Sequence, residues 1–201
     1  MFGRALASER GRFGRSLRTV AIAVVAVTAV GCGTQQADGD DTRESKAGED
    51  VTYDLTTPPT RADAGMADGE KVAIDETDEG RLVSLGLPGD RTLETEVSLV
   101  TFDSYAAGVD ADTADPTGMD MHTPRMDLSA ATTVLSESLR QLGGAVKIAE
   151  DWRRAAEQAQ GTETVRSENT PLEIGYLTAR VQGRYSPIDQ KASISYTLYW
   201  G

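Results

Sequence analysis

The chain has 201 residues, of which 32 are acidic and 20 basic, with one cysteine and one histidine. One cysteine cannot form an intramolecular disulfide or a cysteine-based zinc or iron–sulfur site, and one histidine cannot supply a pair of imidazole ligands to a metal. The formal net charge of -12 argues against nucleic acid as a partner, because a surface that binds it is rich in lysine and arginine.

The first 31 residues have the features of an export signal. Five arginines and one glutamate come first, and residues 20–30 are then apolar apart from Thr28. That run is too short to span a membrane as a helix, which takes roughly 20 apolar residues, and it fits the apolar part of a signal peptide. We therefore predict a signal at residues 1–31.

The only cysteine follows this run directly, in Ala29-Val30-Gly31-Cys32. Small and apolar residues ending in cysteine at this place resemble the lipobox of a bacterial lipoprotein precursor. The resemblance implies cleavage after Gly31, a diacylglycerol thioether on Cys32 and, in many bacteria, a further acyl chain such as palmitate on its amino group. Two or three acyl chains anchor a protein stably, so the expected location is the extracytoplasmic face of the cell membrane. The alternatives are an ordinary signal peptide cut near the same place, or a buried cytosolic cysteine.

Charge divides the remaining chain. Residues 33–80 hold 14 acidic and 4 basic side chains, whereas residues 128–201 hold eight of each. Because residues 33–69 show no sustained apolar period and are rich in Gly, Asp and Thr, we expect residues 32–70 to be the lipidated cysteine and an acidic, disordered tether. Residues 71–201 are expected to form one globular domain.

Within that domain, short strands are predicted at 71–74, 81–85 and 93–102, followed by a loop over 103–124. Apolar spacing predicts one helix from residue 128 to the Gly143-Gly144 pair, with Asp127 or Ser129 as its N-cap, and a second from 146 to 160. Residues 172–185 resemble a strand, and residues 192–200 alternate strictly, so we expect a long antiparallel hairpin. The predicted fold is a two-layer α+β domain: an antiparallel sheet with two helices on one face.

The most specific cluster of possible ligands is Met119, Met121, His122 and Met126. Thioether and imidazole groups suit Cu(I), so copper binding by a flexible loop is one hypothesis. The alternative is that these methionines only fill gaps in the packing. No other metal or cofactor is expected, since the acidic loop containing Asp110, Asp112, Asp115 and Asp120 lacks an EF-hand spacing.

No nucleophile elbow, phosphate-binding loop or histidine-based metal motif occurs, although a Ser/His/Asp triad through His122 stays open. Tyr199 alternates away from the apolar face of the last predicted strand and is a candidate contact residue. We therefore expect a membrane-anchored, non-catalytic binding module of the cell envelope, whose partner is another envelope protein, a wall polymer or a lipid. A copper-binding protein and an envelope hydrolase are the alternatives.

Overall fold

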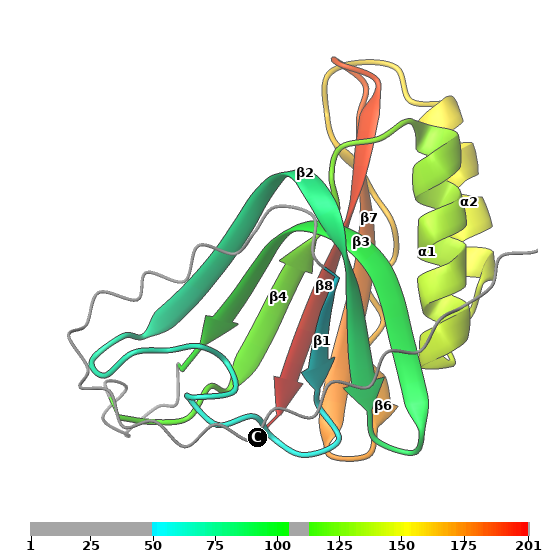
Figure 1. Cartoon of the computed structure of the whole chain (residues 1–201). Coiled ribbons are helices and arrows are strands. Elements are labelled where there is room, and N and C mark those ends of the chain that lie inside the picture. Colours follow the sequence, from blue (N-terminus) through cyan, green and yellow to red (C-terminus); the bar gives the residue numbers. More distant parts are fainter. Residues whose placement is uncertain (1–49, 105–112, 201) are drawn as a thin grey trace, which may run out of the picture. The chain divides into compact units, whose positions relative to one another are not determined.

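The computed structural model of the chain describes residues 50–104 and 113–200 (Figure 1). The elements of this part are β1 (Val51–Asp54), β2 (Val72–Leu87), β3 (Arg91–Asp103), β4 (Gly118–His122), α1 (Leu128–Leu142), α2 (Lys147–Glu157), β5 (Val165–Arg166), β6 (Leu172–Ile174), β7 (Leu177–Ser186) and β8 (Lys191–Trp200). The strands form one sheet in the order β1-β2-β3-β4-β8-β7-β5, and β6 also pairs with β7. The predicted α+β architecture is confirmed, with β1 and β2 as a parallel exception.

The β2–β3 hairpin is bent sharply, so that its two halves form the limbs of an inverted V (Figure 1). The bend lies where the register shifts: Glu76 pairs with Leu99, whereas Arg81 pairs with Val97. Residues 77–80 therefore oppose a single residue of β3, which is a large bulge, and bulges bend strands. Gly80 has a φ of 79° there, a conformation that residues with a Cβ rarely adopt. An ion pair between Asp75 and the buried Arg81 joins the two sides of the bulge.

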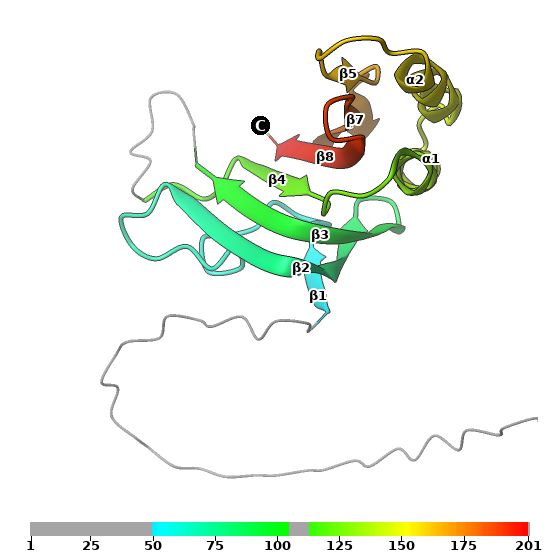
Figure 2. The same ribbon diagram turned by 90° about the horizontal axis from the view of Figure 1, so that it is seen from above.

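The helices cover one end of the curved sheet (Figure 2): α1 contacts β3, β7 and β8, and α2 contacts β5 and β7. Helix α1 begins at its N-cap Asp127, whose carboxylate accepts a hydrogen bond of 2.8 Å from the backbone N–H of Ala130. It ends at Gly143, which has a φ of 80°. Both boundaries agree with the sequence prediction.

Helix α2 is shorter than the predicted range 146–160. Ala149, Trp152 and Ala156 form its buried face, whereas Ala155 is exposed. Trp152 packs on β7 where Gly183 leaves room, because a Cβ at Gly183 would lie 2.9 Å from three atoms of the Trp152 ring. The Trp152 indole also donates a hydrogen bond of 3.2 Å to the Val165 carbonyl oxygen.

The C-terminal hairpin is present, with β7 paired to β8 over ten residue pairs. The expected strand at 172–185 is interrupted: β6 ends at Ile174, and Gly175, with a φ of 64°, turns the chain into β7. The predicted loop over 103–124 is wrong for residues 118–122, because β4 lies there between β3 and β8. Its five residues alternate between the faces of the sheet, as strand residues do.

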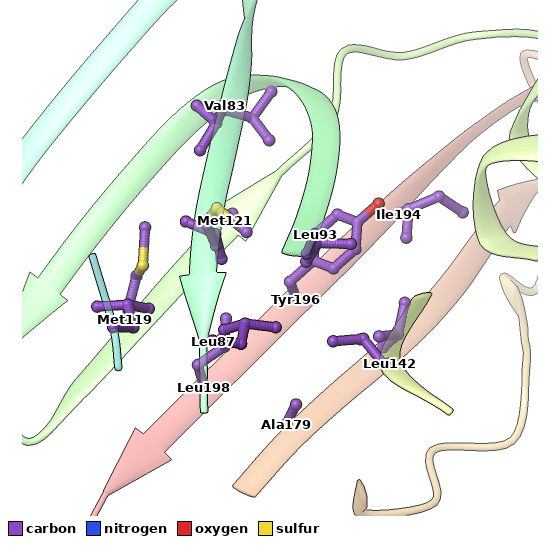
Figure 3. Packing of buried hydrophobic residues seen from close by; sticks show 14 of the residues in the cluster. Val83, Leu87, Leu93, Met119, Met121, Leu142, Ala179, Ile194, Tyr196 and Leu198 are labelled. Carbon is purple, nitrogen blue, oxygen red and sulfur yellow. The ribbon is translucent and has the colours of Figure 1, made fainter. Parts of the chain in front are cut away.

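The core lies between the limbs of the bent hairpin, the strands β4 and β8, and the buried face of α1 (Figure 3). Met121 and Tyr196 are cross-strand partners there, and both are almost completely buried. Burying one large apolar side chain contributes about 1.5–3 kcal/mol, so this continuous cluster explains a stable domain without disulfides.

The folded part begins earlier than expected, so the predicted tether over 32–70 is too long. Strand β1 pairs with β2 from Val51 to Asp54, and Leu55, Ala64 and Met66 behind it belong to the buried core. The sequence signal was weak because β1 has four residues and the packed segment after it lacks a helical or strand period.

Candidate functional site

A cleft with a volume of about 470 Å³ lies between strand β1 and the first half of the bent hairpin. Its walls come from β1, the turn at residues 63–65, the beginning of β2 and the end of β3. The bend at residues 77–80 is the reason for the opening, since it carries the first half of β2 away from the half that pairs with β1. A smaller cavity of about 180 Å³ adjoins the cleft and shares Tyr53, Asp63 and Phe102 with it.

The cleft has an apolar floor and acidic groups among its walls. Tyr53 and Phe102 meet edge to face there, with ring centroids 5.3 Å apart, and Val100 lies beside them. Ile74, which is 68% exposed, also lines the cleft. Two carboxylates, Asp63 and Asp75, are among the lining residues, and no lysine, arginine or histidine is. This chemistry suits a ligand that combines an apolar body with a neutral or positive polar group.

The two carboxylates are held in place by hydrogen bonds. Asp63 accepts from the side-chain hydroxyl of Thr60 at 2.7 Å and from its backbone N–H at 2.9 Å. Those bonds, the side-chain one first, lower the pKa of Asp63, so it stays ionised at neutral pH. Asp75 forms the ion pair with Arg81. Asp63 is therefore a fixed negative charge at the wall of the cleft, whereas the charge of Asp75 is paired with Arg81.

The structure separates the residues of the predicted copper cluster. Met119 and Met121 are fully buried on the inner face of β4. His122 follows them in the strand and therefore lies on the opposite face, where it is half-buried. Met126 is partly buried against the core. The two strand methionines pack as core residues, and the geometry does not bring them together with the imidazole.

His122 lies on the outer face, with Asp120 two residues before it and Ser195 opposite it on β8. Burial lowers the pKa of His122, Asp120 acts in the opposite direction, and Arg184 lowers it further. Asp120 accepts a hydrogen bond of 2.6 Å from Thr197, and the Ser195 hydroxyl points to the Gln182 carbonyl oxygen at 3.4 Å. The side-chain bonds of these residues therefore do not form the relay of a catalytic triad.

Tyr199, the predicted contact residue, is 38% exposed on the same outer face. The guanidinium carbon of Arg180 lies 5.8 Å from the centre of its ring, within the range of a cation–π interaction. Of the acidic loop, Asp110 and Asp112 lie outside the described residues, and Asp115 accepts a hydrogen bond from the Arg61 backbone. In the described ranges, no group of three Asp, Glu, His or Cys side chains is placed to hold a metal ion.

Cys32 and the predicted signal lie outside the described residues. Among the helices that the structure describes, none is both long and apolar enough to cross a membrane.

Sequence reasoning missed the cleft, because half of its walls lie in the segment assigned to the tether. The available signal was the alternation of Val51 and Tyr53 with polar neighbours, over only four residues. No family model, curated protein or solved structure matches the chain.

Proposed function

We propose that the protein is a lipid-anchored, extracytoplasmic binding module without catalytic activity, whose cleft takes a small apolar molecule carrying a positive charge. The observation that supports this most is the cleft itself: about 470 Å³, with two aromatic rings among its lining, the carboxylate of Asp63, and that of Asp75, which is paired with Arg81. Its volume is within the usual range of about 300–1,000 Å³ for small-molecule sites. The lowered pKa of Asp63 supports charge recognition over proton transfer, because a general acid at neutral pH needs a raised pKa.

The anchor half of the proposal depends on Cys32, through the signal and the lipobox resemblance. We expect the mature protein to partition into the detergent phase, and Cys32→Ala to move it to the aqueous phase. Mass spectrometry of the mature N-terminus should find a diacylglycerol group on Cys32. Partition of the wild-type protein into the aqueous phase would contradict the anchor and leave the cleft proposal unaffected.

The cleft half is tested by calorimetry with two probes of equal chain length, decyltrimethylammonium and decyl sulfate, below their micelle concentrations. The full-length chain carries Cys32→Ser, so that no lipid competes for the site. We expect the cation to bind and the anion to bind at least about tenfold more weakly, because the carboxylates repel it. Equal binding of the two probes would contradict the assignment.

Two cleft variants and one control variant localise the binding. Ala73→Phe places a ring in the cleft and should abolish cation binding, whereas Ala155→Phe, on the exposed face of α2, should not. Asp63→Asn keeps an oxygen acceptor for Thr60, removes one charge and should weaken binding by about fivefold. Circular dichroism confirms that each variant is folded. Unchanged affinity in folded Ala73→Phe would show that the cation binds elsewhere.

A further inference from the structure

A cluster of basic side chains lies on the outer face of the sheet, at the edge formed by β5, β7 and the start of β8. Arg166 of β5 lies directly opposite Arg184 of β7, and both are exposed. Like charges directly opposite each other in an antiparallel pair are destabilising. Arg180 occupies the same face of β7, and Lys191 begins β8 near Arg184. Among the described residues, none of these four side chains forms an ion pair with a carboxylate.

A cluster of basic side chains without ion-pair partners is unusual in so acidic a protein. The protein carries 12 more acidic than basic side chains, so carboxylates were abundant as partners. The acidic residues nearest in the pairing scheme are engaged elsewhere. Asp120 bonds Thr197, Glu173 bonds Thr178, and Asp189 pairs with Arg125. Like charges that lie close together without neutralising partners are typical of sites that bind a ligand of the opposite charge.

Two contacts set the directions in which the arginines lie. Arg184 donates from Nε to Gln182 at 3.4 Å, so its side chain leans along β7 toward residue 182. Arg180 lies over Tyr199, which pairs with Thr178, so it leans the same way. Four residues of strand separate the two Cα atoms by about 13 Å, and the parallel lean keeps the guanidinium groups apart. One small anion cannot bridge them, whereas an extended chain with repeated anionic groups can.

The groups between the arginines suit a sugar chain. Gln182 and Thr197 carry amide and hydroxyl groups on this face, Ser195 between them is buried, and the Tyr199 ring, 38% exposed, lies at one end of the face. The Nε atom of Arg180 is buried and has no hydrogen-bond partner among the described residues. A bound carboxylate or phosphate group would offer charge compensation to that arginine.

We infer that the outer face of β5, β7 and β8 is a docking surface for an anionic polysaccharide, through Arg166, Arg180 and Arg184. This surface is separate from the cleft, because none of its residues lines the cleft. A phospholipid surface is the less favoured occupant, because the chain is acidic overall and the two exposed apolar side chains near the cluster, Ile188 and Tyr199, lie at opposite ends of it and form no continuous apolar patch.

The test uses the full-length chain with Cys32→Ser in four binding assays at low salt. The probes are a polyuronate, a phosphorylated dextran, neutral dextran, and nanodiscs containing phosphatidylglycerol. We expect both anionic polymers to bind, neutral dextran to bind at least about tenfold more weakly, and added salt to weaken the binding.

The decisive variant is Arg166→Gln with Arg184→Gln, which removes two charges from the docking surface. It should weaken polymer binding by about tenfold. The matched control, Arg153→Gln with Arg154→Gln, removes the same charge from the exposed face of α2 and should change the affinity by less than about twofold.

Several outcomes would overturn the inference. These are binding of neither anionic polymer, equal losses in the two double variants, or unchanged affinity when Arg166 and Arg184 are replaced. Binding to the nanodiscs alone would assign the surface to a membrane instead. The cleft variant Ala73→Phe should leave polymer affinity unchanged, so failure at one site is distinguishable from failure at the other.

Discussion

The two faces of β4 and β8 differ in what their side chains can do. On the inner face, Met121 and Tyr196 pair across the strands and are 0% and 1% exposed. On the outer face, the next residue pair along, His122 and Ser195, lies under no helix. Neighbours in the sequence therefore have unrelated roles, because alternate side chains of a strand point to opposite faces. In a flexible loop, the side chains of a Met-x-Met-His segment can converge on one site. In a strand, the methionines and the histidine lie on opposite faces of the sheet.

The largest expected effect contrasts the two neighbours directly. Met121→Ala removes a fully buried side chain and leaves a cavity, so it should lower the free energy of unfolding by about 3 kcal/mol. His122→Ala, on the other face, should lower it by less than about 1 kcal/mol. Urea denaturation measures both. Equal losses would show that the outer face contributes to stability as the core does.

A smaller loss of unfolding free energy is expected from removing the buried hydroxyl group of Tyr196 on the inner face. The Tyr196 hydroxyl lies 2.9 Å from the Thr95 hydroxyl and 2.8 Å from the Ser138 hydroxyl, and burial raises its pKa. Ser138 donates to the Val134 carbonyl oxygen, so Tyr196 donates to Ser138 and accepts from Thr95. Tyr196→Phe should therefore cost about 1–2 kcal/mol by leaving Thr95 unpaired. If urea denaturation gives the same free energy of unfolding for Tyr196→Phe and the wild-type protein, this hydrogen-bond network is contradicted.

The outer face should show its own signature in the pH dependence of stability. Burial lowers the pKa of His122 in the folded protein, whereas the unfolded chain titrates near the ordinary value of about 6.5. Below that pH the unfolded chain binds more protons, so stability should fall as the pH drops from 7.5 to 5. His122→Gln should flatten this slope in denaturation curves across that range. If the slope of stability against pH is unchanged in His122→Gln, the pH dependence comes from another titratable group.

The smallest effect concerns the opposed arginines and should have the opposite sign. Arg166→Glu places a carboxylate opposite Arg184, so it replaces a repulsive cross-strand pair with an attractive one. The expected gain is about 0.5 kcal/mol, and thermal unfolding measures it. A loss of stability would mean that the positive charges are already compensated.

The sequence predicted those elements whose signal is local. Helix α1 has a cap residue, an apolar stripe and a terminal glycine within its own segment, so both ends were found. Strand β8 alternates over its whole length. Strand β4 has only five residues and lies among Asp, Gly and Thr, so its strand character depends on β3 and β8 on either side of it.

Most of the candidate site could not be predicted from local sequence patterns. The cleft depends on a parallel pairing between β1 and a half of β2 more than 30 residues away in the chain. It also depends on the bulge that bends β2, and Gly80 alone does not reveal a bulge in the sequence. Tyr199, in contrast, was placed on the outer face by alternation alone, and the structure places it there.

The central position of β4 and β8 in the sheet has a consequence for the order of folding. The hairpins β2–β3 and β7–β8 close between neighbouring segments, but the sheet is joined only when Gly118 meets Tyr199. Closing so long a loop costs chain entropy before any contact compensates for it, so this step should be late and slow. During synthesis, β4 is made before β8, so the edge of β4 that pairs with β8 stays unpaired until β8 has been synthesised. That interval is when the chain most needs protection from pairing with another molecule.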